Sequence, residues 1–141
     1  MPRTADALAR VLADCQARAP AEAVGVVLAG PAGPQVVPLR NALPDPEART
    51  AFAVDPREWM AVERGALDRG QRLAALYHSH PGGPLALSAA DLRFATPGGQ
   101  GLAADLQLWL VGPDSGGKLN QFKCFNFIEG AWRHASPCSF G

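Results

Sequence analysis

The fold is decided by one stretch of the chain, residues 73–91, which has the sequence LAALYHSHPGGPLALSAAD. Residues 73–77 are apolar and follow polar residues, which is typical of a buried strand. The Pro and Gly residues at 81–84 exclude a regular continuation of that strand and predict a turn. Ser88 stands where a helix N-cap is expected, immediately before residues 89–95. The stretch therefore predicts a strand, a loop and a helix in succession.

Two histidines and one aspartate of this stretch can face a single metal ion. His78 and His80 are two positions apart at the strand end, so their side chains point to the same side of an extended chain. Asp91 falls in the first helical turn, and the loop can fold it back onto the histidines. Three such protein ligands with one open position are typical of a catalytic zinc site. A capping box of Ser88 and Asp91 is the alternative, but it does not explain the two histidines.

Glu22 is the candidate residue for proton transfer. It follows a helical segment and precedes the apolar run at residues 24–28, which places it at a strand start near the interior of the sheet. The alternative for Glu22 is a solvent-exposed charge at a helix end. A carboxylate beside a metal can take a proton from water and give it to a leaving amine. The hydroxyl of Ser88 can then donate to the oxyanion.

These residues together resemble the JAMM motif of the MPN (JAB1/Mov34/PAD-1) metalloprotease family. The resemblance is carried by Glu22, His78-x-His80, Ser88 and Asp91. It covers the chain from Glu22 to about residue 111, and Val24 departs slightly from the small residue or Cys that the family usually has there. The resemblance implies one zinc ion per chain, held by His78, His80 and Asp91. It also implies that Glu22 transfers the proton and that Ser88 stabilises the oxyanion.

The resemblance also implies the MPN fold, an α/β, cytidine-deaminase-like fold with a mixed, mostly antiparallel sheet flanked by helices. The order of the predicted elements agrees with this fold, since strands alternate with helices along the chain. Helices are predicted at Thr4–Ala17, from Pro56 to near Gly70 with Trp59, Met60, Val62 and Leu67 as its apolar face, and at residues 89–95. Strands are predicted at residues 23–28, 35–39, 50–54, 73–77, 106–111, 121–128 and 131–134.

Length and composition predict one small globular domain, residues 1–135, followed by a loose tail at 136–141. Trp132, just before the tail, and Phe140 within it could dock on the domain. A chain of 141 residues is long enough for a single core and too short for two. The formal net charge is zero and the chain has no basic cluster, so nucleic acid is not expected as a partner. No apolar run is long enough for a membrane span and residues 1–6 lack a signal-peptide core, so a cytoplasmic protein is expected.

The three cysteines, Cys15, Cys124 and Cys138, are odd in number and widely spaced. This pattern favours reduced thiols in a cytoplasmic protein over a disulfide framework, and it excludes a structural zinc finger. A nucleophilic cysteine acting with His134 has no local support in the sequence. The chain also lacks the H-E-x-x-H motif of helical metalloproteases and the two-cysteine motif of nucleobase deaminases.

The resemblance implies a metallopeptidase or isopeptidase. The chain is too short for the insertions of the eukaryotic isopeptidases and resembles the compact prokaryotic members instead. Those members cleave after the C-terminal Gly-Gly of ubiquitin-like or sulfur-carrier proteins, and we expect a substrate of that kind. The alternative is a phage tail-assembly protein with the same motif, acting on cell-wall peptide or on a tail protein. Residues 39–56 have a similar form in both groups, so both alternatives stay open, as do the linear or isopeptide nature of the bond and the oligomeric state.

Overall fold

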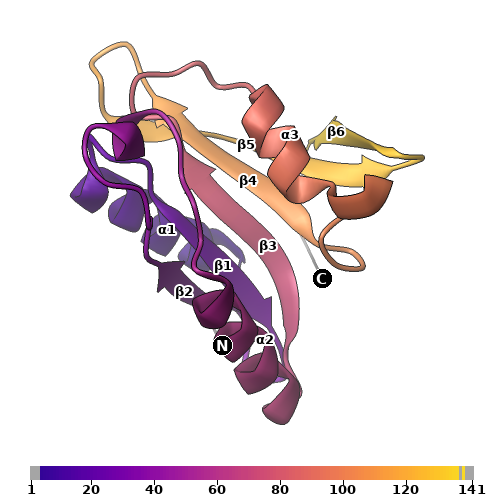
Figure 1. Cartoon of the computed structure of the whole chain (residues 1–141). Helices are drawn as coiled ribbons and strands as arrows, with labels where there is room; N and C mark the ends of the chain where they lie inside the picture. The colour runs from indigo at the N-terminus through magenta and orange to yellow at the C-terminus, as the bar shows by residue number, and fades with distance from the viewer. Residues whose placement is uncertain (1–3, 137, 139–141) are drawn as a thin grey trace.

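The computed structural model describes residues 4–136 and 138, and this part of the chain folds into three α-helices around one six-stranded sheet (Figure 1). The helices are α1 (Thr4–Arg18), α2 (Pro56–Asp68) and α3 (Ala89–Ala95). The strands are β1 (Val24–Ala29), β2 (Gln35–Leu39), β3 (Arg72–Ser79), β4 (Gln107–Pro113), β5 (Leu119–Ile128) and β6 (Ala131–Ala135). Two short 3-10 helices, η1 (Glu47–Arg49) and η2 (Pro97–Gly99), lie in the loops.

The sheet has the strand order β2-β1-β3-β4-β5-β6. Strands β3 and β4 run parallel, whereas the other neighbouring pairs are antiparallel. The structure thus confirms the predicted α/β class with a mixed, mostly antiparallel sheet. Because β1 and β3 are antiparallel, the start of β1 lies beside the end of β3, with Val24 opposite His78. This pairing brings the segment of Glu22 next to the two histidines.

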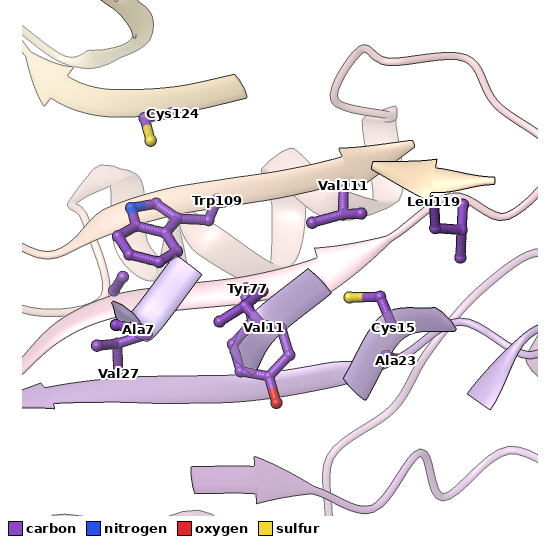
Figure 2. Packing of buried hydrophobic residues seen from close by; sticks show 11 residues of the cluster. Ala7, Val11, Cys15, Ala23, Val27, Tyr77, Trp109, Val111, Leu119 and Cys124 are labelled. Atoms are coloured by element: carbon purple, nitrogen blue, oxygen red, sulfur yellow. The ribbon is translucent and has the colours of Figure 1, made fainter. Parts of the chain in front are cut away.

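The two faces of the sheet are covered by different helices. On one face, Val11 of α1 belongs to the hydrophobic cluster that includes Tyr77 and Trp109 (Figure 2). On the other face, Leu76 belongs to the cluster that includes Ala66 of α2 and Ala95 of α3. Successive side chains of a strand point to opposite faces, so Tyr77 of β3 faces α1 while Leu76 faces α2 and α3. Strand β3 is therefore buried on both sides.

A network of polar contacts fixes α1 to the central strands. The hydroxyl of Tyr77 donates to Asp14 Oδ2 at 2.6 Å, and Arg18 Nη2 lies 2.8 Å from the same oxygen. Arg18 also donates to the carbonyl of Val24 at 2.6 Å. The ring of Tyr77 occupies the space beside Gly25, where any added Cβ would overlap it. A glycine is therefore required at this position, which fixes the close approach of β1 and β3.

The predicted strand at residues 50–54 is wrong. Residues 51–55 have no regular secondary structure, and Ala53 O accepts a hydrogen bond from Ala42 N at 2.8 Å. The side chain of Asn41, and not a neighbouring strand, bonds to Ala51 O and Ala53 N at 3.1 and 3.3 Å. Since side-chain amides can replace ladder partners, the β-like composition of this segment is compatible with an ordered loop.

Helix α2 follows Asp55-Pro56 as predicted, but its apolar face is only partly the predicted one. Trp59 and Val62 pack on the core between α2 and the sheet. Met60 and Leu67 are 63% and 79% exposed, so these two members of the predicted apolar face are not buried. These two residues are two helical turns apart, and together with Leu73 of β3 they line a shallow surface pocket. The other predicted helices and strands are confirmed, with small differences at their ends.

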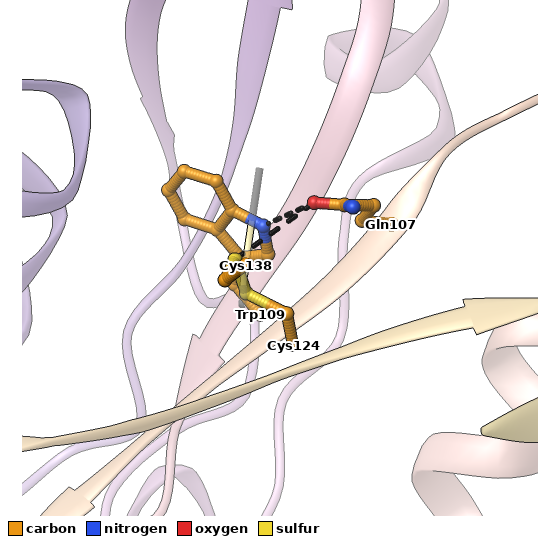
Figure 3. The surroundings of a disulfide bond; sticks show 4 residues. All are labelled: Gln107, Trp109, Cys124 and Cys138. Atoms are coloured by element: carbon orange, nitrogen blue, oxygen red, sulfur yellow. Dashed lines mark hydrogen bonds between the residues drawn. A yellow bond between two sulfur atoms is a disulfide. The ribbon is translucent and has the colours of Figure 1, made fainter. Parts of the chain in front are cut away.

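The prediction of three reduced cysteines is also wrong. Cys124 of β5 forms a disulfide with Cys138, with a Cα–Cα distance of 5.6 Å, next to Trp109 and Gln107 (Figure 3). The reason is the β5–β6 hairpin, in which Cys124 pairs with Ala135 and so brings the following residues back to β5. Cys15 is a buried free thiol on α1, as predicted for all three.

The C-terminal residues are described in part. The predicted loose tail at 136–141 includes Cys138, which is joined to β5, whereas Phe140 lies outside the described residues together with 137, 139 and 141. Trp132 of β6 is partly buried and donates from Nε1 to Thr96 Oγ1 at 3.2 Å. None of the helices in the described chain is long and apolar enough to cross a membrane.

Candidate metal centre

The end of β3 presents two imidazoles to the side of the sheet that α3 covers. His78 is on the same face of the strand as Leu76, and His80 follows two positions later. Ser79, between them, points to the opposite face, where its Oγ accepts from Ala23 N at 2.8 Å. His78 and His80 are 1% and 7% exposed, so both imidazoles are withdrawn from bulk water. The alternation of the strand thus produces the predicted pair.

The N-terminus of α3 supplies the carboxylate. Ser88 is the N-cap, and its Oγ accepts from Asp91 N at 3.0 Å. In return, Ser88 N donates to Asp91 Oδ2 at 2.9 Å, which completes a capping box. The same oxygen lies 3.0 Å from Nε2 of both His78 and His80. Capping and the approach to the histidines are therefore not alternatives, because the capping box holds Asp91 where it meets both rings.

His78, His80 and Asp91 form a group whose candidate ligand atoms lie within 4.8 Å of one another. Neither ring nitrogen of His78 has an aligned hydrogen bond to the described residues, although both nitrogens are buried. Nδ1 of His80 lies 2.8 Å from the carbonyl oxygen of Pro84, to which it can donate, leaving Nε2 directed at Asp91. A backbone carbonyl that accepts a hydrogen bond from the other ring nitrogen orients a metal-binding histidine. These three residues can therefore bind a metal ion.

Electrostatics keep His78 neutral and Asp91 ionised, the forms that bind a metal ion, whereas His80 must lose its proton on binding. Burial lowers the pKa of His78, and the nearby Asp91 only partly opposes this shift. Burial acts in the same direction on His80, but hydrogen bonds to Asp91 and to the Pro84 carbonyl outweigh it and raise the pKa. Burial would raise the pKa of Asp91, yet its contacts with the two histidines hold that pKa well below its usual range. Asp91 is thus a carboxylate at neutral pH.

Glu22 lies two residues before the start of β1 and is 4% exposed. It lines a cavity of about 410 Å³ together with His80, Ser88 and the loop at residues 82–87. Burial raises the pKa of Glu22 to about 7, an effect that His80 opposes and Asp91 reinforces. Among the described residues, no group bonds to Glu22 Oε1. A carboxylate with a pKa near neutrality, in a cavity that His80 also lines, is suited to accept and release a proton.

The comparisons with known proteins agree with this geometry. The family model of prokaryotic homologs of the JAB domain matches residues 4–125. The chain belongs to this family. A curated relative from Thermus thermophilus, named a probable TtuB-protein conjugate cleaving protease, is 36% identical over 77 residues. That match covers 55% of this chain and 51% of the relative, so the chain spans about half the length of the curated relative it matches.

A protein of Desulfitobacterium hafniense, whose structure was determined in solution, shares the fold of this JAB-domain protein. The two structures superimpose with a TM-score of 0.63, and the match covers 91% of this chain and 84% of that chain. Their sequences are 23% identical, so the similarity concerns the fold alone.

The structure of this JAB-domain protein adds residues that the sequence did not indicate. Arg49 and Thr50 line the same cavity as the loop after His80. Phe52 covers His78, with ring centroids 5.2 Å apart, and also contacts Phe94 of α3. All of these loop residues come from the segment between β2 and α2. The sequence signals for them are weak, because they are contributed by a loop of irregular conformation and not by a periodic element.

Proposed function

We propose that this protein is a zinc-dependent peptidase that hydrolyses the peptide or isopeptide bond after the C-terminal Gly-Gly of a ubiquitin-like or sulfur-carrier protein. The proposal is carried by one observation, the convergence of His78, His80 and Asp91 within 4.8 Å, beside a cavity that Glu22 and Ser88 line. Membership of the JAB-domain family supports a hydrolase of this class.

The chemistry of the ligand set favours zinc. Two imidazoles and a carboxylate suit zinc, whereas magnesium and calcium prefer oxygen ligands. When bound, zinc polarises a carbonyl and lowers the pKa of water towards neutrality. Three protein ligands leave one position of a tetrahedral ion open, as in catalytic sites. We therefore assign His78, His80 and Asp91 as the ligands of one zinc ion per chain.

Glu22 is assigned to proton transfer. Its carboxylate accepts the proton of the attacking water and delivers it to the leaving amine, both within the cavity that it lines with His80. Ser88 is assigned to the oxyanion. Its Oγ accepts from Asp91 N at 3.0 Å, so the hydroxyl hydrogen remains available to the substrate oxygen.

A covalent mechanism through cysteine has no support in the structure. Burial, reinforced by Asp14, raises the pKa of the Cys15 thiol to about 12, so that the nucleophilic thiolate is not formed near neutral pH. Cys124 and Cys138 are joined in a disulfide. Direct attack by water is therefore the proposed reaction, without an acyl-enzyme, and thiol reagents should leave turnover intact.

The substrate assignment rests on the shape of the cavity and on the family. A Gly-Gly tail has the least side-chain bulk for an approach bordered by residues 82–87 and by Arg49 and Thr50. An extended tail can also add backbone hydrogen bonds against a strand or loop edge. The name of the Thermus thermophilus relative, a probable protease of TtuB-protein conjugates, supports a small protein tag as substrate.

The proposal is tested with a ubiquitin-like domain whose Gly-Gly tail is fused to a reporter protein. We expect cleavage after the second glycine, loss of cleavage with a chelator, and recovery with added zinc. Asp91→Ala should lose zinc and turnover together, whereas Glu22→Gln should keep zinc and lose about 10²–10⁴-fold in turnover. Glu63→Gln, a surface change on α2, is the matched control.

Two outcomes would overturn parts of the proposal. Near-normal turnover of Glu22→Gln would remove Glu22 from the mechanism. Cleavage of a Gly→Leu tail as fast as Gly-Gly would refute the tail specificity, and hydrolysis of cell-wall peptides in the same assay would favour the tail-assembly alternative.

A further inference from the structure

The side chain of Asn41 lies at the centre of the loop between β2 and α2. Its Nδ2 donates to the carbonyl oxygens of Glu22 and Ala51 at 3.0 and 3.1 Å, and lies 3.4 Å from the carbonyl oxygen of Ala48. Its Oδ1 accepts from Leu43 N and Ala53 N at 3.1 and 3.3 Å. The nitrogen and the oxygen of one amide side chain therefore both bond to the loop, and the nitrogen also bonds to the backbone of Glu22.

Glu22 is held to this loop through both of its backbone polar groups. Its N–H donates to Ala48 O at 2.7 Å, and its carbonyl accepts from Asn41. The next residue, Ala23, donates from its N–H to Ser79 Oγ at 2.8 Å. The carboxylate itself has no hydrogen bond at Oε1 to the residues that the structure describes. The backbone of residues 22 and 23 therefore helps to position the carboxylate, and this backbone is bonded to the loop between β2 and α2 and to Ser79.

The same loop forms one wall of the cavity. Arg49 and Thr50 of this loop line the cavity, and Phe52 of the same loop lies against the His78 ring. A displacement of the loop would therefore move Glu22 relative to the cavity. Asn41 does not contact His78, His80 or Asp91 by hydrogen bond in the described structure. A substitution of Asn41 is therefore expected to affect Glu22 without changing the metal ligands.

We infer that Asn41 is a positioning residue for Glu22: its amide fixes the proton-transfer carboxylate in the cavity without contacting substrate or metal ligands. This inference rests on the proposed role of Glu22. The substitution Asn41→Asp keeps an oxygen that accepts from Leu43 N and Ala53 N but removes the amide donor to the Glu22 carbonyl. Misplacement of a catalytic group by about 1 Å can reduce turnover by about 10²-fold. We expect Asn41→Asp to lower kcat by about tenfold to a hundredfold with KM nearly unchanged.

The decisive experiment is a double-mutant cycle with zinc-loaded protein and the Gly-Gly fusion substrate. The proteins are the wild type, Asn41→Asp, Glu22→Gln and the double variant. If Asn41 acts through the Glu22 carboxylate, Asn41→Asp should have almost no further effect on kcat in the Glu22→Gln background. A general structural role would lower kcat by the same factor in both backgrounds, and that result overturns the inference.

Two further measurements do not depend on turnover. Zinc affinity should be the same for Asn41→Asp and the wild type, and amide hydrogen exchange at Glu22 should become faster in the variant. Asn120→Asp is the matched control, because Asn120 is an exposed asparagine whose side chain donates to Asp114. If Asn41→Asp folds poorly, Asn41→Ala replaces it in the same cycle.

The possible failures are distinguishable. Wild-type turnover of Asn41→Asp, with Glu22→Gln inactive, refutes the inference and leaves the proposed function in place. Wild-type turnover of Glu22→Gln refutes the proposed role of Glu22 itself. Unchanged hydrogen exchange at Glu22 in Asn41→Asp also contradicts the anchoring of this residue by Asn41.

Discussion

Replacing Glu22 by glutamine should stabilise the metal-free protein, and the gain should depend on pH. The side chain is 4% exposed, and burial is the main reason why its pKa rises from the ordinary 4.5 to about 7. The folded state therefore holds the proton more tightly than the unfolded state. Below pH 4.5 both states are protonated and the wild type has no penalty; as the pH rises to 7 the penalty grows, and above 7 it is complete.

The magnitude follows from the same values. A tenfold change in proton affinity is worth about 1.4 kcal/mol, so the change in pKa from 4.5 to about 7 destabilises the ionised folded protein by about 3 kcal/mol. Glutamine resembles the protonated acid and does not ionise. The free energy of unfolding of Glu22→Gln should thus equal that of the wild type near pH 4.5 and exceed it by about 3 kcal/mol at pH 8.

The assay is urea unfolding of chelator-treated protein at several pH values from 4.5 to 8, with Glu63→Gln as control for the loss of one surface carboxylate. A wild type that is as stable as Glu22→Gln at pH 8 would show that the Glu22 carboxylate is not buried at an unfavourable site. Added zinc should reduce the difference, because a nearby cation stabilises the ionised carboxylate.

Other changes have definite expected results. Gly25→Ala should lower the free energy of unfolding by about 1–3 kcal/mol in urea melts, since the added Cβ overlaps the Tyr77 ring, and an unchanged midpoint would contradict this close packing. Reduction of the Cys124–Cys138 disulfide, which spans 14 residues, should lower the free energy of unfolding by about 3 kcal/mol. A melting temperature that does not change with dithiothreitol would contradict this expectation. Ser88→Ala should lower the free energy of unfolding by about 1 kcal/mol through the lost N-cap. At normal zinc content, it should also lower turnover by about 10²–10³-fold. A turnover loss below tenfold would show that Ser88 is a capping residue only.

The local patterns of the sequence were sufficient to predict where most residues of the candidate site lie. The two-residue period of a strand placed His78 and His80 on one face, and the N-cap preference placed Ser88 and Asp91 at a helix start. Both patterns depend on short-range geometry, which the amino-acid types determine. Glu22 required more, because its approach to the histidines depends on the antiparallel pairing of β1 with β3.

The errors arose where long-range contacts decide the structure. The segment at residues 50–54 has the composition of a strand, but the amide of Asn41 bonds to its backbone in place of a neighbouring strand. Met60 is apolar and helical, yet the position of α2 over the sheet leaves it exposed. The pairing of Cys124 with Cys138 depends on the β5–β6 hairpin, which widely spaced cysteines do not reveal.

The metal centre is tested most directly by calorimetric titration of chelator-treated protein with zinc. We expect about one zinc per chain, with ligands from His78, His80 and Asp91, and release of protons on binding because the raised pKa of His80 favours its protonated form. His80→Ala should abolish this binding. A folded wild-type protein that shows no affinity for zinc, with all three ligands intact, would contradict the proposed centre.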